Sequence, residues 1–246
     1  MNAIKNPRLV VFSGAGLSAD SGIATFRADT GLWANHDVRV VADGMTWRNH
    51  RNTIRNFYND RRQDVAKAQP NAAHQQIAKW QSRYDTVILT QNIDNLLERA
   101  GCSDVIHLHG EITKLKCVAC GNVWDIGHNI VLDTDRCPKC NSLKGTRPAV
   151  VFFNEAAPNY AKMYAAFKNL TAQDCVVVIG TSGQVINIDA FIQSVSSKSI
   201  LNNLETRSGI NESLYSHVIM GQASHVISNI DSLVTDHFNQ IGAHDA

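Results

Sequence analysis

The stretch Leu9-Val-Val-Phe-Ser-Gly-Ala-Gly-Leu-Ser-Ala19 joins an apolar run to a glycine turn and then to a predicted helix. A short, nearly continuous apolar run is typical of a strand buried on both faces of a parallel sheet. The turn fits the GxGxxA pattern through Gly14 and Gly16. Such glycines let a backbone approach a pyrophosphate, and the helix that follows directs N–H groups at the charge. A tight strand-to-helix turn without a ligand would use the same residues, so that alternative stays open.

Similar apolar runs recur along the chain, and each ends in a polar or glycine-containing cluster. The predicted strands are 9–12, 86–90, 105–108, 150–153, 175–179, 199–204 and 217–220. Residues with helical spacing lie between several of them, as at Tyr160, Met163 and Phe167. Strands that alternate with helices predict an α/β fold with a doubly wound, mostly parallel sheet.

Two stretches interrupt this alternation. Residues 31–70 read as helical, and residues 114–147 hold four cysteines with few core-forming residues. We expect these two stretches to form a smaller domain, and 1–30, 71–113 and 148–246 to form the large one. A chain of 246 residues is long enough for one main core with such an insert.

Composition excludes several classes of partner. Lys and Arg total 23 and Asp and Glu total 22, a net charge of +1, so we expect no nucleic-acid partner and no membrane. The apolar runs fall short of the roughly 18 to 20 residues that a membrane helix needs. The first residues do not read as a signal peptide, and the clustered cysteines suit bound metal, so we expect a cytoplasmic protein.

The cysteines form two CxxC pairs, Cys117 with Cys120 and Cys137 with Cys140. The intervening residues, 121–136, fit the spacing of an all-cysteine zinc site. Four thiolates complete a tetrahedral shell and leave no open position for a substrate. The sequence therefore predicts one structural zinc ion.

Polar residues also follow three predicted strands: Gln91-Asn-Ile-Asp94, His109-Gly-Glu111 and Gly180-Thr-Ser-Gly183. Ligands of open α/β sheets bind outside the carboxyl ends of the strands, so these clusters should converge with the glycine turn. His109 lies at the tip of its strand and is the candidate general base, whereas His107 lies deeper and suits a structural role. A dehydrogenase would next have a strand that ends in an acid for the ribose, but residues 31–70 read as helical, which indicates an unusual handling of an NAD-like nucleotide.

Taken together, Gly14-Ala-Gly-Leu-Ser-Ala-Asp-Ser-Gly-Ile-Ala-Thr-Phe-Arg27, Thr90-Gln-Asn-Ile-Asp-Asn-Leu96, His107-Leu-His-Gly-Glu111, the cysteine quartet and Gly180-Thr-Ser182 resemble the sirtuin family of NAD-dependent protein deacylases. The resemblance runs from residue 9 to about residue 227. It implies a Rossmann-like large domain, a small zinc-binding and helical domain, and a cleft that takes NAD as cosubstrate and an acylated lysine of a protein.

Residue by residue, the resemblance assigns most of the cleft to the cosubstrate. The implied cofactor-binding residues are Gly14, Ala15, Gly16, Phe26, Arg27, Gln91, Asn92, Ile93, Asp94, Gly180, Thr181, Ser182, Asn203, Leu204, Glu205 and Ala223. Asn92 and Asp94 would line the nicotinamide pocket, and Asn203 to Glu205 with Ala223 would hold the adenosine end. The resemblance implies that His109 is the catalytic base and that Asn92 is a second catalytic residue. The base would take a ribose hydroxyl proton while the acyl group moves to ADP-ribose, leaving nicotinamide, O-acyl-ADP-ribose and free lysine.

The acyl preference is read from Tyr58 and Arg61, which lie one helical turn apart. On spacing alone Arg61 could pair with Asp64 or Asp60. Tyr-x-x-Arg at this position, however, resembles the sirtuins that remove succinyl, malonyl or glutaryl groups, in which both side chains would grip the acyl carboxylate. Deacetylation is a further expected activity.

Some positions depart from the family pattern. Asn154 replaces a glycine in the segment expected to pair with the substrate peptide, and Asn tolerates positive φ better than most residues. Asn187 replaces a common proline, and Ala24-Thr25 replaces Pro-Asp.

Two other functions are alternatives to deacylation. An ADP-ribosyltransferase or NAD hydrolase would use the same cleft, and a zinc-organised NAD sensor would bind without turnover. The sequence does not contain the GxSxG of a serine hydrolase. It leaves the protein substrates, the ranking of acyl groups and the oligomeric state open.

Overall fold

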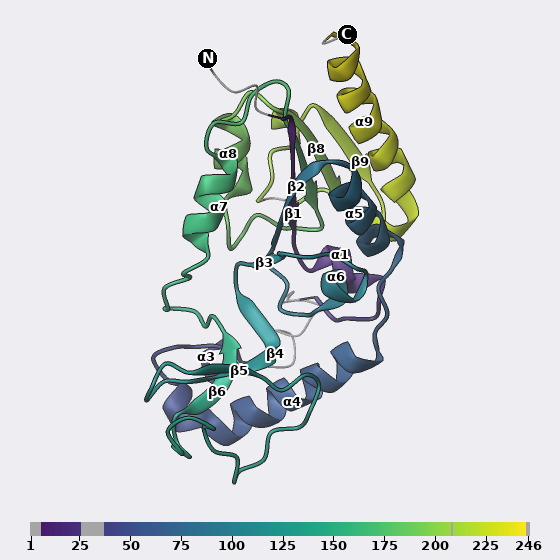
Figure 1. Cartoon of the computed structure of the whole chain (residues 1–246). Coiled ribbons are helices and arrows are strands. Elements are labelled where there is room, and N and C mark those ends of the chain that lie inside the picture. Colours follow the sequence, from purple (N-terminus) through teal and green to yellow (C-terminus); the bar gives the residue numbers. More distant parts are fainter. Residues whose placement is uncertain (1–5, 26–36, 208, 245–246) are drawn as a thin grey trace.

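The computed structural model describes residues 6–25, 37–207 and 209–244. A six-stranded sheet with helices on both faces forms the upper part of the molecule in Figure 1, and a smaller module lies below it. Phe26 and Arg27, predicted to contact the nucleotide, lie outside the described residues.

The large sheet has the strand order β3-β2-β1-β7-β8-β9, and every neighbouring pair is parallel. Its strands are β1 (Arg8–Ser13), β2 (Asp85–Thr90), β3 (Ile106–His107), β7 (Cys175–Ile179), β8 (Lys198–Asn203) and β9 (His217–Met220). The chain leaves β1 first toward β2 and β3, and later returns to the other side at β7. The order therefore reverses between β1 and β7, which is where doubly wound sheets bind ligands. The predicted doubly wound parallel sheet is confirmed.

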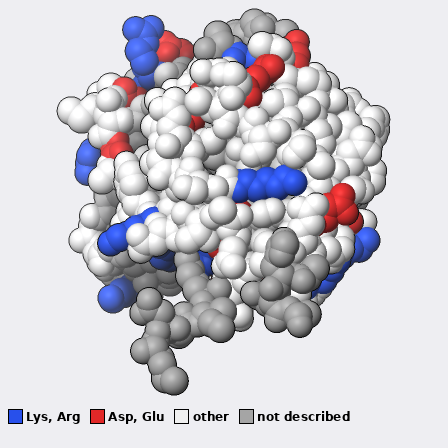
Figure 2. Space-filling view, turned by 90° about the horizontal axis from the view of Figure 1, so that it is seen from above, with Lys and Arg blue, Asp and Glu red and all other residues white. Residues whose placement is uncertain are grey.

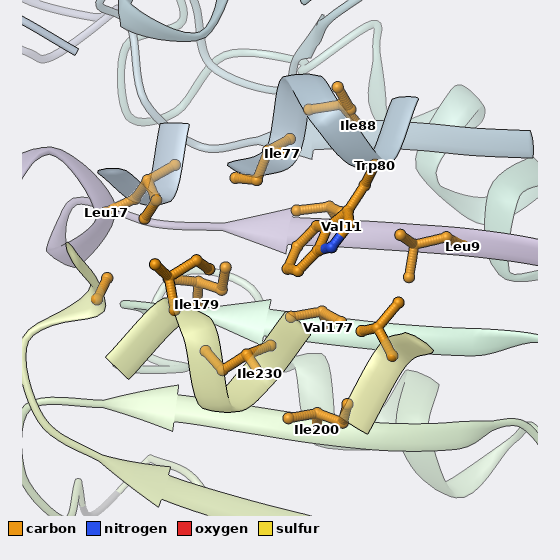
Figure 3. Packing of buried hydrophobic residues seen from close by; sticks show 14 of the residues in the cluster. Leu9, Val11, Leu17, Ile77, Trp80, Ile88, Val177, Ile179, Ile200 and Ile230 are labelled. Carbon is orange, nitrogen blue, oxygen red and sulfur yellow. The ribbon is translucent and has the colours of Figure 1, made fainter. Parts of the chain in front are cut away.

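Side chains alternate between the two faces of the sheet. Leu9 and Val11 of β1 pack with the helices α1 (Gly16–Ala19), α5 (Ala72–Arg83), α6 (Leu96–Arg99) and α9 (Ala223–His244). Figure 3 shows this core around Trp80, Val11 and Ile230. Val10 and Phe12 point to the other face, where they pack with α7 (Tyr160–Phe167) and α8 (Ile188–Gln193). Burial on both faces explains why the strands read as continuous apolar runs.

The small module is built around α4 (Arg51–Lys67), with α3 (Val38–Val41) and the 3₁₀ turn η1 (Trp47–His50) before it. A three-stranded antiparallel sheet packs beside this helix, in the order β5-β4-β6. Its strands are β4 (Gly110–Cys117), β5 (Val123–Asp125) and β6 (Thr146–Val150). A separate apolar cluster, including Trp47, Ile54 and Phe152, forms the core of the module.

One predicted strand was wrong in both position and partner. Residues 150–153 were expected to be a strand like the others, but the strand here is β6, which ends at Val150 and pairs antiparallel with β4. Phe153 instead bonds through its backbone to Ala42 and Gly44. The predicted domain boundaries at 113–114 and 147–148 fall within β4 and β6. The division into two domains stays a prediction. Asn154 has φ of 65°, the conformation for which an asparagine is suited.

The last helix is fastened to the first turn of the chain. Ser224, at the start of α9, donates to Asp20 Oδ2 from its backbone N at 3.2 Å and from its hydroxyl at 2.7 Å. A remaining 3₁₀ turn, η2 (Glu212–Leu214), precedes β9.

The charged side chains are distributed without a dominant sign. Figure 2, which views the molecule of Figure 1 from above, shows Lys and Arg scattered beside Asp and Glu. Among the described helices, none combines the length and apolar character required to cross a membrane.

Candidate functional site

The glycine turn after β1 and the loop after β7 pack against each other at the reversal of strand order. Gly16 N donates to Gly180 O at 2.9 Å, and Gly14 N donates to Ile179 O at 2.9 Å. A Cβ on Gly16 would lie 2.6 Å from Gly180 Cα, and Gly180 itself has φ of +65°. The glycines are therefore needed for the contact between the loops. A backbone without side chains at these positions is also what the close approach of a pyrophosphate requires.

Gln91 connects this glycine contact to the neighbouring strand end. Its Nε2 donates to Thr181 Oγ1 at 2.9 Å, and its backbone N donates to Ser13 O at 2.9 Å. Thr181 is buried and Ser182 is half-buried beside it. The structure thus brings the predicted ribose and phosphate residues from β1, β2 and β7 to one edge.

A polar network lies beneath the crevice. Ser18 Oγ accepts from Asn92 Nδ2 at 3.0 Å and donates to Asp94 Oδ2 at 3.0 Å, while Leu96 N donates to Asp94 Oδ1 at 3.1 Å. Burial raises the pKa of Asp94. The buried His74 has Nε2 at 3.4 Å from Ser18 Oγ, and burial lowers its pKa to about 4, so this imidazole is neutral. The network holds Asn92 and Asp94 in fixed positions.

These residues line a cavity that we call the Asn92 cavity. Its lining consists of Ala15, Ser18, Ile23, Ala24, Arg61, Asp64, Val65, Asn92, Ile93, Asp94 and Ile112. Residues from the first turn, from the β2 loop and from α4 therefore meet in one space between the large sheet and the small module. The predicted nicotinamide-pocket residues are all among them.

His109 follows β3 and makes two hydrogen bonds. Its Nδ1 lies 3.1 Å from Gln91 O, and its Nε2 lies 3.0 Å from Tyr160 Oη. A carbonyl oxygen only accepts, so Nδ1 carries the proton and Nε2 presents its lone pair to the tyrosine hydroxyl. Burial lowers the pKa of His109, although the Gln91 carbonyl acts in the opposite direction. A neutral imidazole whose Nε2 can accept a proton is what a general base requires.

His107 differs from His109 in its surroundings and supports the site from below. Its Nδ1 lies 2.8 Å from Asn92 O and its Nε2 lies 2.8 Å from Glu98 Oε1. Burial disfavours its positive charge, but the hydrogen bond and charge of Glu98 and the Asn92 carbonyl outweigh burial and raise its pKa. The structure gives His107 the buried, partnered position that we predicted for it.

Tyr58 and Arg61 do not meet in one cavity. Arg61 lines the Asn92 cavity and pairs with Asp64 at 2.8 Å. Tyr58 is buried, stacks on Phe152 with ring centroids 5.9 Å apart, and lines a second cavity with Trp47 and Arg55. Arg61 therefore combines both positions that the spacing allows: it forms an ion pair with Asp64, and it lines the Asn92 cavity.

The predicted adenosine end follows β8 and begins α9. Asn203 is buried and accepts from Gly221 N at 2.9 Å through its backbone O. Leu204 is 53% exposed and Glu205 pairs with Arg207, so both lie at the surface. Ala223 is buried at the first turn of α9. These positions lie at the edge of the sheet beyond Gly180.

The four cysteines form a compact cluster at the end of β4. Cys117 Sγ lies 3.6 Å from Cys140 Sγ, and Cys120 Sγ lies 3.7 Å from Cys137 Sγ. All four sulfurs lie within 4.8 Å of one another. Disulfide sulfurs are about 2.05 Å apart, whereas zinc bonds of about 2.3 Å in a tetrahedron put sulfurs about 3.8 Å apart. The cluster therefore fits one structural zinc ion.

Two residues belong to the site although the sequence does not indicate a role for them, Ser18 and Tyr160. Ser18 lies inside the quoted glycine motif, but only the fold shows that it joins Asn92 to Asp94. Tyr160 was read only as a helical core position, yet it contacts the candidate base from α7. Asn159 also donates to His107 O at 2.8 Å, which holds α7 against this strand end. No local pattern could have indicated contacts between segments so far apart in sequence.

The comparisons with known proteins agree with this arrangement. The model of the Sir2 family matches residues 14–187. An NAD-dependent protein deacylase of Helicobacter hepaticus is 39% identical over 94% of this chain and 99% of its own length. One of Campylobacter jejuni is 36% identical over 93% of this chain and 97% of its own length.

Solved structures give the same result. The NAD complex of a Sir2 homolog covers 95% of this chain and 91% of that chain, with a TM-score of 0.80 and 29% identity. A mutant Sir2 homologue in complex with ADP-ribose covers 97% of this chain and 94% of that chain, with a TM-score of 0.83 and 28% identity. The resemblance read from the motifs is confirmed, and this chain belongs to the Sir2 family.

Proposed function

We propose that this protein is an NAD-dependent protein-lysine deacylase. The observation that carries the proposal is the neutral His109, whose Nδ1 donates to Gln91 O beside the glycine loops and whose Nε2 accepts from the Tyr160 hydroxyl. The names of the relatives from Helicobacter hepaticus and Campylobacter jejuni support the activity. The NAD and ADP-ribose complexes of Sir2 homologues support the cosubstrate.

Different residues of the chain would accept the proton and orient the cosubstrate during the reaction. NAD would supply the sugar carbon, which loses nicotinamide and bonds the acyl oxygen, and the hydroxyl that receives the acyl group; one water is consumed, and nicotinamide, O-acyl-ADP-ribose and free lysine are the products. His109 Nε2 accepts the proton of a ribose hydroxyl, because Gln91 O keeps the other ring nitrogen protonated. Asn92 and Asp94, held by Ser18, orient the nicotinamide end. Fixed placement of the reacting groups supplies much of the rate.

Substitution of the base tests this proposal. In His109→Ala, we expect deacylation to fall by roughly 10²- to 10⁴-fold, the usual contribution of a general base. The measurement is release of free lysine and acyl-ADP-ribose from acyl-lysine peptides with NAD, followed by mass. An ADP-ribosyltransferase or NAD hydrolase is the competing function. Rapid nicotinamide release without any acylated peptide would favour that function over deacylation.

We further propose a preference for acidic acyl groups such as succinyl and malonyl. Arg61 is the one cation among the described residues that line the Asn92 cavity. A guanidinium bonds carboxylates through charge-assisted hydrogen bonds, which contribute about 1.5 to 3 kcal/mol. Tyr58, which lines the other cavity, gives this preference no support in its present position. The preference therefore rests on Arg61.

Arg61→Met separates the two acyl classes. We expect desuccinylation to fall roughly tenfold or more, because the carboxylate loses its cation, with a much smaller effect on deacetylation. Arg55→Met is the matched control: Arg55 is on the same helix, is paired with Asp133 and has a side chain 22% exposed, as has Arg61, but it lines the other cavity. Equal losses on both substrates in Arg61→Met would contradict the preference.

We also propose that the protein works in the cytoplasm. The six described cysteines are free, and the four of the cluster must stay reduced to hold zinc. Recovery of the protein from an exported fraction of the cell would contradict this location.

A further inference from the structure

The charged groups of the Asn92 cavity include an ion pair within one helix. Arg61 Nε lies 2.9 Å from Asp64 Oδ2, and Arg61 Nη2 lies 2.8 Å from the same oxygen. Both residues line the cavity, and the side chain of Arg61 is 22% exposed while that of Asp64 is 46% exposed. The guanidinium that faces the cavity is therefore already matched by a carboxylate of the chain.

Helix stability does not explain the carboxylate. Asp64 lies in the last turn of α4, which ends at Lys67, and a negative charge there opposes the helix dipole. The order is also the weaker one, because acid before base along a helix gives the better pair. Half of the Asp64 side chain faces solvent, so the pair adds little to folding.

The pair has opposite consequences for the two classes of acyl group. When a neutral group fills the cavity, Asp64 keeps Arg61 partnered, so no uncompensated charge is left beside the ligand. When an acidic group enters, its carboxylate must share Arg61 with Asp64 and is repelled by it. The other carboxylate that lines the cavity is Asp94. Its two oxygens accept hydrogen bonds from Ser18 and from the backbone of Leu96, not from Arg61.

We propose that Asp64 is a specificity-determining residue that widens the acyl range of the site toward neutral groups at the expense of acidic ones. This inference rests on the proposed deacylase function and on the role of Arg61 in it. Asp64 acts on the substrate through its charge and through its hold on Arg61.

The test compares Asp64→Asn with the unchanged full-length protein on succinyl-lysine and butyryl-lysine peptides, which differ mainly in the charge of the acyl end. We expect the ratio of kcat/KM for succinyl over butyryl to rise roughly fivefold, the size of a partly exposed ion pair. Asp60→Asn is the matched control, because Asp60 is exposed on the same helix and does not line the cavity. It should leave the ratio unchanged.

The outcomes separate this inference from the function on which it rests. If Arg61→Met lowers desuccinylation selectively but Asp64→Asn leaves the ratio unchanged or lowers it, the role of Asp64 is overturned and the acyl preference stands. If Arg61→Met has no selective effect, both are overturned. Thermal unfolding and bound zinc of each variant identify a misfolded protein, and Asp64→Ser, which also removes the charge, then provides the same comparison.

Discussion

The crevice of the large sheet and the small module are held together by different means. In the crevice, hydrophobic strands fix the backbone, and the polar side chains at their ends bond mainly to one another, as Ser18, Asn92 and Asp94 do. In the small module the apolar cluster is smaller, and buried charges and cysteines hold the segments together. A sheet can position a site through topology alone, whereas the small module depends on particular ionic and metal contacts.

Arg62 illustrates the contacts of the small module. Its side chain is almost fully buried, and it donates to Ile112 O at 2.9 Å and to Asn59 Oδ1 at 2.8 Å. Burial lowers its pKa to about 10, so it remains charged near neutral pH. The guanidinium joins α4 to β4. Arg147 has a similar role, since it pairs with Glu155 and stacks over Phe152.

Removal of zinc should have the largest effect, because it should unfold part of the small module and leave the large sheet intact. A structural zinc ion contributes about 10 kcal/mol or more, so chelation should unfold the cysteine segment and abolish deacylation. We expect the large sheet to survive, because its core contains no cysteine of the cluster. Circular dichroism and activity before and after chelation measure both effects. Full activity without bound metal would show that the module holds its shape without the ion.

Gly180→Ala tests the crevice through its backbone. A Cβ there would lie 2.6 Å from Leu17 N, and φ is +65°, so we expect a loss of about 3 kcal/mol in the free energy of unfolding. Gly22→Ala is the matched control, with φ of +86° but nothing within 4 Å of the added carbon, and should cost about 1 kcal/mol. Thermal or denaturant unfolding measures the difference. Equal losses would mean that the contact between the loops is not tight.

Tyr160→Phe should have the smallest effect. It tests whether the hydrogen bond of the Tyr160 hydroxyl sets the pKa of His109. The tyrosine hydroxyl donates to the neutral form of His109, so its loss should raise the pKa of the base. In the unchanged protein, burial keeps that pKa below the ordinary 6.5, and activity falls only as the pH drops through it.

The measurement for Tyr160→Phe is the pH profile of kcat/KM, which reports the free enzyme. We expect its acid limb to move upward by a few tenths of a pH unit. Tyr164→Phe is the control, because Tyr164 is on the same helix and is 60% exposed. A limb that does not move would mean that Tyr160 has no influence on the base.

The sequence predicted the large sheet well because its central strands, β1, β7 and β8, are buried on both faces. Cys175 to Ile179 is apolar throughout and was placed correctly. Spacing alone placed the cysteine cluster, since ligand geometry depends little on the surrounding fold. The small sheet was missed because β4 alternates charged and apolar residues, as at Lys114 and Lys116, and β5 is short. Val150 to Phe153 looked like a core strand, but only Val150 belongs to one.

Within the candidate site, strand ends could be predicted and side-chain partners could not. His109, Gln91 and Gly180 follow strands that the pattern located, and parallel topology brings their loops together. The contact of Tyr160 with His109 depends on the path of α7, and the cavity of Tyr58 depends on the packing of α4. Neither is encoded in a local pattern. The assignments of Phe26 and Arg27 stay predictions.

The hydrogen bonds from Ser224 to Asp20 join residues 204 positions apart. During synthesis on the ribosome, Asp20 therefore waits for at least 204 further residues before these two bonds can form. The glycine turn after β1 is thus synthesised long before α9, and the loop that contains Asp20 gains its partner only when the start of that helix has been made.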